Sequence, residues 1–247
     1  MIASIQLEKR KIQIDLSKGI DISTPLRAEE GQVSAWYVDP IQIEPVRAEG
    51  FVGSVKEGGS VNFRNILFNP HGHGTHTECV GHITTEVYSV NEHIREYFMM
   101  AQLISVEPEK IEDDLVITKD QIIPHLIENT SALVLRTLPN SADKLKRNYS
   151  GTNPAYLSDE LLVALREAGI RHLLLDLPSV DREVDGGALL GHRAFWNLNG
   201  DIRMNASITE MVYVPSEVKD GEYFLNLQFP SFENDASPSR PLLFALI

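Results

Sequence analysis

A strand, a helix and a second strand follow one another in the middle of the chain, and this succession constrains the fold most. Residues 131–137 form a short apolar run, which is typical of a buried strand. Residues 158–168 predict a helix, with Ser158 as its N-cap, a stripe of leucines on one face and Gly169 at its end. Residues 171–176 form the strand that follows. This order predicts a parallel pair of strands in a layered α/β domain.

The rest of the chain adds further strands and one short helix. Thr118 and Gln121 have the spacing of a capping box, which predicts a helix over residues 118–129. Two polar segments, residues 140–153 and 186–191, are predicted to be loops. Alternating or apolar runs predict additional strands at residues 11–17, 61–68, 101–107, 210–214, 223–229 and 242–247.

Composition bounds the size of the protein and its partners. The chain has 247 residues, of which 43% are hydrophobic, and no repeat or linker, so we expect one domain over residues 1–247. Its net charge of -13 repels phosphate backbones, which argues against nucleic acid as a partner. Cys79 is the only cysteine, so no disulfide can form within the chain. The sequence shows neither the apolar core of a signal peptide nor an apolar stretch of about 20 residues, so we expect a cytoplasmic protein without a membrane partner.

Half of the histidines gather in one short segment. Four of the eight lie within twelve residues: His71, His73, His76 and His82. Imidazole nitrogens and carboxylate oxygens are the usual ligands of zinc and similar ions, and Glu78 lies among these histidines. Gly72 and Gly74 allow a tight backbone, so that neighbouring side chains can converge. The alternative is a polar, histidine-rich loop that binds no metal or binds it adventitiously. We interpret the segment as a metal site.

Residues 74–82 read Gly-Thr-His-Thr-Glu-Cys-Val-Gly-His, which is similar to the signature of the cyclase family, His-x-Gly-Thr-His-x-Asp-x-Pro-x-His. That family includes bacterial kynurenine formamidases. Residues 176–181, Asp-Leu-Pro-Ser-Val-Asp, resemble its Asp-Thr-Pro-Ser-Val-Asp segment, and residues 15–17 resemble its opening Asp-Leu-Ser. The resemblance extends over residues 12–215, with the motifs in the same order.

The resemblance implies roles for individual residues. His76 matches a histidine ligand, and Glu78 stands where an aspartate bridges two metal ions. His82 matches a histidine that serves in proton transfer. His192 and Glu210 match later ligands that complete a second metal position. The implied cofactor is one or two divalent ions, with zinc favoured and manganese as the alternative.

Three departures separate the chain from the signature. The family's first histidine aligns with Gly72, so its role passes to His71 or His73, whose side chains share one face of an extended segment. We favour His71, because it leaves the longer turn before the next ligand, although both can bind. Glu78 replaces the aspartate, which moves the carboxylate by one carbon–carbon bond, and Val80 replaces a proline.

Other residues have two interpretations each. Asp176 and Asp181 either orient the imidazoles of metal ligands or cap loops. Ser179 has no visible base beside it, so we expect it to stabilise a turn. Three aromatic residues either line a substrate pocket or belong to the core: Trp36, Tyr37 and Phe68. Three basic residues form the only local basic patch, which either attracts an anionic substrate or, as we expect, belongs to a solvated loop: Lys144, Lys146 and Arg147.

The function that follows is an arylformamidase-like, metal-dependent hydrolase that cleaves an amide, formamide, or cyclic amide or ester of a small molecule. The metal activates water and polarises the substrate carbonyl, and His82 moves the proton. The alternatives are a metal-dependent lyase or dehydratase, and a non-catalytic binding protein on the same fold. The resemblance implies an α/β fold with a mixed, barrel-like β-sheet and flanking helices, in a homodimer or higher oligomer. It leaves the identity of the substrate open.

Overall fold

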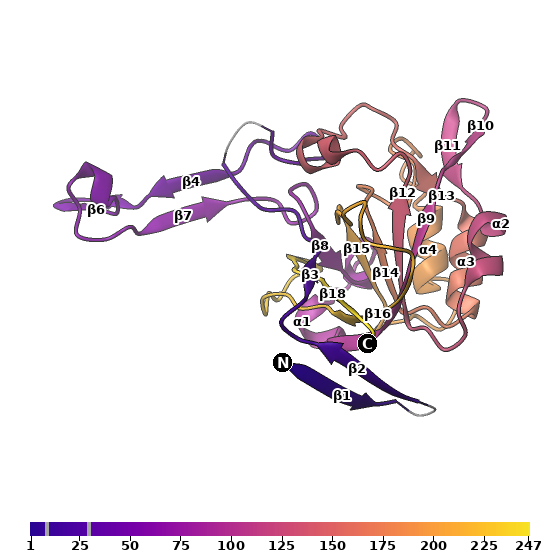
Figure 1. Cartoon of the computed structure of the whole chain (residues 1–247). Helices are drawn as coiled ribbons and strands as arrows, with labels where there is room; N and C mark the ends of the chain where they lie inside the picture. Colours follow the sequence, from indigo (N-terminus) through magenta and orange to yellow (C-terminus); the bar gives the residue numbers. More distant parts are fainter. Residues whose placement is uncertain (8–9, 29–30) are drawn as a thin grey trace.

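A computed structural model describes residues 1–7, 10–28 and 31–247 and is built around one nine-stranded mixed sheet (Figure 1). The four middle strands, β15, β14, β12 and β9, run parallel, and the strands on either side are antiparallel to their neighbours. In sheet order the strands are β17 (Ala236–Pro238), β8 (His76–Glu78), β15 (Ser207–Glu210), β14 (His172–Leu175), β12 (Ala132–Thr137), β9 (Phe98–Val106), β16 (Gly221–Asn226), β18 (Leu242–Ala245) and β3 (Ile20–Asp21). The fold is therefore α/β with a mixed sheet, as the sequence predicts.

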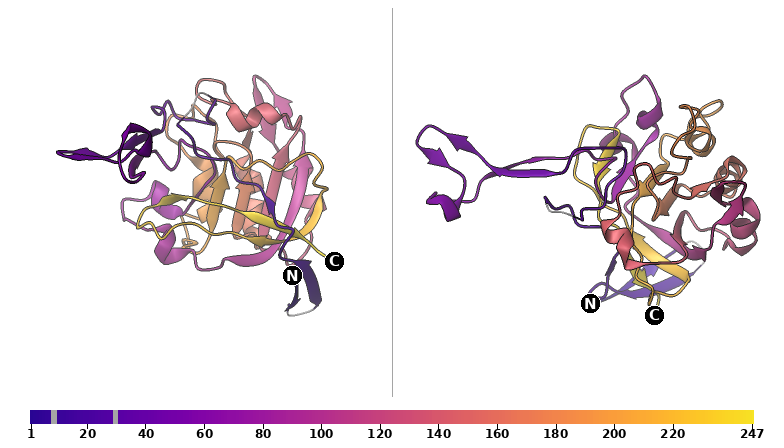
Figure 2. Two further views of the ribbon diagram at one scale, coloured as in Figure 1. Left: turned by 60° about the vertical axis from the view of Figure 1, so that its left-hand side comes forward. Right: turned by 90° about the horizontal axis from the view of Figure 1, so that it is seen from above.

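Helices cover one face of this sheet (Figures 1 and 2). They are α2 (Lys119–Ile122), α3 (Asp159–Glu167) and α4 (Leu190–Trp196), with the 3-10 helix η3 (Ile123–His125). Alternating side chains of β12 fill two cores, because Leu133 and Leu135 pack under the helices while Val134 packs on the opposite face. Helix α3 begins where predicted, since the Ser158 hydroxyl accepts a hydrogen bond from Leu161 N at 3.3 Å. The parallel pairing of β12 with β14 confirms the predicted strand–helix–strand unit.

Smaller elements surround the main sheet. Strands β1 and β2 form a hairpin near the two chain ends, and β10, β11 and β13 form a separate three-stranded sheet. Their bounds are β1 (Ile2–Gln6), β2 (Lys11–Asp15), β10 (Glu109–Ile111), β11 (Asp114–Ile117) and β13 (Tyr156–Leu157). The short helical turns are η2 (Val80–Ile83), α1 (Val90–His93) and η4 (Ala142–Lys146). Within the described residues, no helix has the length and apolar character needed to cross a membrane.

A two-stranded arm, residues 42–67, projects from the body of the molecule (Figures 1 and 2). It consists of β4 (Gln42–Pro45), β5 (Arg47–Ala48), β6 (Phe51–Val52), η1 (Val55–Glu57) and β7 (Arg64–Leu67). The arm exposes large apolar side chains along its length, among them Phe63, Ile66 and Leu67. Strand β7 leads directly into the histidine-rich segment, so the arm is continuous with that part of the chain.

Some predicted boundaries are wrong, for local reasons. The strand expected at residues 210–214 instead ends at Glu210, because Met211 adopts a left-handed φ of 52° and its N–H bonds Leu177 O. Instead of one helix over residues 118–129, the structure has the short helix α2 followed by the 3-10 helix η3. Pro124 lies in the first turn of η3, where a proline is tolerated, and η3 ends at His125. The predicted loop at residues 186–191 already contains the start of α4.

Candidate metal centre

Strand pairing places three of the predicted ligands on one face of the sheet. Strands β8 and β15 are antiparallel, with His76 directly opposite Glu210. Glu78 lies on the same face as His76, because side chains two apart in a strand point the same way. The residues between them point to the other face, where the hydroxyls of Thr77 and Thr209 lie 2.8 Å apart. His76 Nε2 and Glu210 Oε2 are 3.3 Å apart, and both side chains are buried.

Helix α4 brings His192 to the same point. Asp181 holds the start of this helix, since its carboxylate accepts hydrogen bonds from Gly191 N at 2.6 Å and His192 N at 3.2 Å. The His192 Nδ1–H donates to Asp181 Oδ2 at 2.5 Å, which directs Nε2 to within 3.2 Å of Glu78 Oε1. Glycine at position 191 allows this contact, because a Cβ there would lie 2.6 Å from Leu162 Cδ1 and 2.7 Å from Asp181 Oδ1, so these side chains would have to move. Asp181 thus orients an imidazole, which is the first of its two predicted roles.

The structure separates the two candidates for the first histidine. His71 Nδ1 lies 3.1 Å from Glu78 Oε2, within the cluster. His73 points elsewhere: its Nε2–H donates to Asp39 O at 2.9 Å, and its Nδ1 accepts from Asn69 N at 2.9 Å. Both nitrogens of His73 are therefore committed to backbone groups at the base of the arm. Of the two, His71 alone is placed to reach a metal bound at Glu78.

His82 lies at the open side of the cluster, beside a carboxylate that the sequence did not point to. Its side chain is 30% exposed, and its Nε2 is 3.8 Å from Glu78 Oε2. Asp235 Oδ2 lies 2.7 Å from His71 Nε2 and 3.5 Å from His82 Nδ1. Asp235 belongs to none of the recognised motifs. Only the pairing of β17 with β8 brings it here, so the sequence carried no signal for it.

The donor set fits a divalent ion. His71, His76 and His192 each use one ring nitrogen as a donor to an outer acceptor, namely Asp235, Gly74 O and Asp181. The other nitrogen of each ring faces a glutamate of the cluster. Three buried atoms here make no well-directed hydrogen bond among the described residues, although imidazoles and carboxylates of the cluster approach them: His76 Nε2, Glu78 Oε2 and Glu210 Oε1. Buried polar atoms are normally paired, so these atoms are the expected ligands of a cation.

The charges of the metal-free cluster are strongly coupled. Burial opposes ionisation of Glu78, but the electrostatic attraction of His82 and the close imidazoles of His192 and His71 hold its pKa well below the usual range. Burial and the neighbouring Glu78 raise the pKa of Glu210. Burial also opposes the charged form of His71 and His192, yet their carboxylate partners raise the pKa of each to about 10. Without metal, protons occupy the positions that a cation would take.

Residues near the cluster prove to be structural. The prediction of a solvated basic patch is wrong for Lys144. Its side chain is buried, with its Nζ 2.7 Å from Asp176 Oδ2. Asp176 therefore balances a lysine and contacts no candidate ligand imidazole. The Ser179 hydroxyl accepts from Asp181 N at 3.0 Å, which is the predicted turn role. Cys79 is buried, and its thiol donates to a backbone carbonyl.

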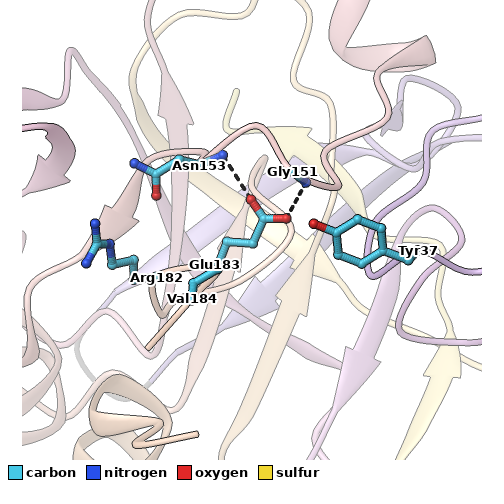
Figure 3. Close-up of a pocket in the computed structure, with 6 residues that line it drawn as sticks. All are labelled: Tyr37, Gly151, Asn153, Arg182, Glu183 and Val184. Atoms are coloured by element: carbon cyan, nitrogen blue, oxygen red, sulfur yellow. Dashed lines mark hydrogen bonds between the residues drawn. The ribbon is translucent and has the colours of Figure 1, made fainter. Parts of the chain in front are cut away.

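The three aromatic candidates differ in position. Trp36 packs against a small core that includes Met211. Tyr37 is 76% exposed and lines a cavity of about 290 Å³ together with Glu183 (Figure 3). Figure 3 shows the Tyr37 hydroxyl directed toward Gly151 and Glu183, whose carboxylate accepts from Gly151 N at 2.5 Å. Phe68 stacks on Phe232 with ring centroids 6.4 Å apart.

Comparison with known proteins identifies relatives of the sequence and of the fold. A sequence model of the family described as putative cyclase matches residues 14–182, which is more than half of the chain. A predicted metal-dependent hydrolase from Bacillus stearothermophilus has the same fold, with a TM-score of 0.64, 19% identity, and 92% of this chain and 98% of that chain covered.

Isatin hydrolase A from Labrenzia aggregata, bound to benzyl benzoate, gives a TM-score of 0.66 at 15% identity, with 93% of this chain and 94% of that chain covered. A structure described as a novel cyclase gives a TM-score of 0.67 at 12% identity, with 94% of this chain and 90% of that chain covered. A search of curated proteins gives no match.

Proposed function

Since the chain belongs to the cyclase family, we propose that it is a metal-dependent hydrolase that cleaves an amide, formamide, or cyclic amide or ester bond. The observation that carries the proposal is the cluster of imidazoles and carboxylates around Glu78. His71, His76 and Glu78 offer donor atoms within 4.8 Å of one another, Glu210 faces His76, and His192 faces the other oxygen of Glu78. Buried nitrogen and oxygen atoms of this cluster make no well-directed hydrogen bond within the described ranges. Structural relatives described as a metal-dependent hydrolase and as isatin hydrolases support the reaction class.

The proposed ligands come from four segments of the chain: His71, His76, Glu78, His192 and Glu210. Zinc is our first choice of metal and manganese the second, because both accept imidazole and carboxylate ligands. A bound divalent ion lowers the pKa of water and polarises a carbonyl oxygen. Glu78 faces His71 with one oxygen and His192 with the other, which places its carboxylate between two parts of the cluster and suits a bridging role.

His82 is the proposed proton carrier. It is the most exposed imidazole of the cluster, and its Nε2 faces Glu78. From there it can accept the proton of the attacking water and deliver it to the leaving nitrogen or oxygen. Two potential nucleophiles nearby are unsuited to attack: the Ser179 hydroxyl holds a turn, and burial raises the pKa of the Cys79 thiol to about 11. Water is therefore the proposed nucleophile.

An aryl-bearing substrate fits the aromatic pair beside the cluster. Phe68 precedes His71 by three residues, and Phe232 precedes Asp235 by three residues. The two phenyl rings stack on each other, and the two polar side chains hydrogen-bond to each other. The two segments are therefore joined twice, once through the phenyl rings and once, three residues later, through the proposed ligand His71 and Asp235. A flat aromatic group can pack against such rings while its amide or ester reaches the metal.

We further propose that the protein associates with a second copy of itself through the arm. The arm exposes Phe63, Ile66 and Leu67, and a two-stranded ribbon is marginally stable in water unless it packs on something. Residues 42–67 contain three basic and three acidic side chains, so the arm has no net charge, whereas the whole chain has a net charge of -13. This neutral, apolar arm can therefore approach an acidic second copy without electrostatic repulsion.

The activity can be tested with a panel of small carbonyl compounds. The panel contains an N-formylaniline, a cyclic aryl amide and an aryl ester, and products are identified by mass spectrometry. We expect one class to gain the mass of water, and activity to disappear when a chelator removes the metal. His82→Ala should lower kcat by about 10²- to 10⁴-fold with the metal retained, whereas His93→Ala serves as a control outside the cluster. Full activity of the metal-free protein contradicts the proposal, and a product formed without water indicates a lyase.

A further inference from the structure

We propose that Asp235 is a positioning residue of the metal centre, and that one oxygen of its carboxylate holds the imidazoles of both His71 and His82. The inference rests on the proposed function, which it extends by one residue. Asp235 lies beyond the part of the chain that the family model matches, in the segment that follows the last predicted ligand, Glu210.

The contacts of Asp235 are specific to these two rings. Its Oδ2 is 2.7 Å from His71 Nε2 and 3.5 Å from His82 Nδ1. The two imidazoles stack with centroids 4.2 Å apart and an interplanar angle of 30°. A single carboxylate oxygen therefore faces ring nitrogens of two stacked imidazoles, so that a change in its position affects both.

The backbone fixes Asp235 relative to the proposed ligands. Its carbonyl oxygen accepts from Cys79 N at 2.9 Å, and the next residue, Ala236, pairs with Glu78 in the β17–β8 ladder. On the other side, Asn234 O accepts from Val90 N at 2.9 Å. The carboxylate thus stands directly before β17, the strand paired with the one that carries Glu78, which is the rigid support that a positioning group needs.

The chemistry matches that of a carboxylate that orients metal ligands. A carboxylate accepts only, so His71 must carry its proton on Nε2, which leaves Nδ1 free to bind a metal at Glu78. Asp181 holds His192 in the same way, because it accepts a hydrogen bond from His192 Nδ1. The rings of His71 and His192 are therefore each oriented by a carboxylate outside the proposed ligand set. For His82, a proton on Nδ1 directed at Asp235 leaves Nε2 unprotonated on the side of Glu78, as a base requires. Asp235 therefore links a proposed ligand to the proposed proton carrier.

The experiment compares Asp235→Asn and Asp235→Ala with Glu233→Gln. Glu233 is a carboxylate of the same segment that contacts Ser89 and Asn91 instead of the cluster, so it is a matched control. Zinc affinity of the metal-free proteins is measured by competition with a chromophoric chelator. The visible absorption spectrum is recorded after substitution with cobalt(II), and kcat and KM are determined at saturating metal.

We expect Asp235→Asn to weaken zinc binding by about 10- to 100-fold at unchanged stoichiometry, to alter the cobalt spectrum, and to lower kcat more than KM. Glu233→Gln should match the wild type in all three. Wild-type affinity and spectrum in both Asp235 variants overturn the inference. Loss of one equivalent of metal also overturns it, because Asp235 is then a ligand. A wild type that binds zinc tightly but hydrolyses no compound contradicts the proposed function alone, since affinity and spectrum still test Asp235.

Discussion

Metal binding should strengthen steeply as the pH rises, because the metal-free cluster holds protons where a metal would bind. The pKa values of His71 and His192 are each raised from 6.5 to about 10 by carboxylates that outweigh burial. Both imidazoles are therefore charged near neutral pH. The ion pairs that they form are complete below pH 6.5 and are lost as the pH rises through about 10.

The size of the effect follows from the number of protons displaced. A metal ligand must be unprotonated, so binding at both imidazoles releases about two protons per ion in the neutral range. Each released proton changes the apparent affinity about tenfold per pH unit, which gives about 100-fold per unit for two.

The assay is chelator competition on metal-free protein at several pH values between about 7 and 9, corrected for the protonation of the chelator itself. In parallel, proton release on zinc addition is measured with a pH indicator in weak buffer. His192→Ala should reduce the slope by about one proton per ion, while His93→Ala, outside the cluster, should leave it unchanged. A zinc affinity that does not vary with pH refutes the charge assignment.

Three further predictions test other parts of the structure. Lys144→Met leaves the Asp176 carboxylate buried without its partner, so urea denaturation should show a loss of about 3–5 kcal/mol, and wild-type stability contradicts the role of this ion pair. Gly191→Ala forces a methyl group against Asp181, so zinc affinity should fall by about tenfold or more, and an unchanged affinity argues against positioning by Asp181. Ile66→Asp places a charge on the exposed arm, so light scattering should show a smaller species than the wild type; equal masses contradict association through the arm.

Local patterns predicted the core of the fold because they depend on neighbouring residues. The leucine stripe and cap of residues 158–168 require only contacts within a few residues, and α3 forms there. The strand expected at residues 210–214 failed for the opposite reason. Met211 turns the chain through a hydrogen bond to Leu177, which lies far away in sequence and is invisible to periodicity. Boundaries set by such distant contacts cannot be read from one sequence.

The candidate site shows the same division. The histidine-rich segment and its resemblance to the family signature predict His76 and Glu78 as ligands, and the pairing of β8 with β15 places the third, Glu210, opposite His76. The choice between His71 and His73 depended on a turn at the base of the arm, where the His73 imidazole hydrogen-bonds to the backbone carbonyl of Asp39. Periodicity alone left this choice open. Asp235 could not be found, because only the antiparallel partner of β8 brings it to the cluster.

Similar reasoning explains why the basic patch was misread. Lysines in a polar loop are usually solvated, and the sequence around Lys144 gives no sign of burial. The lysine turns inward because Asp176 follows a buried strand and needs a counter-charge, which Lys144 supplies together with hydrogen bonds to Thr137. A buried ion pair formed between two distant segments is seen only once the fold is known.

The central claim is that the cluster around Glu78 binds a catalytic metal, and elemental analysis of the purified protein tests it most directly. The same sample is assayed for hydrolysis before and after treatment with a chelator, and a His76→Ala variant purified in parallel serves as the ligand-deficient reference. We predict about one zinc or manganese ion or more per wild-type chain, with metal and hydrolysis lost together in the chelated sample and in the variant. A wild-type protein that hydrolyses its substrate with no bound metal contradicts the account.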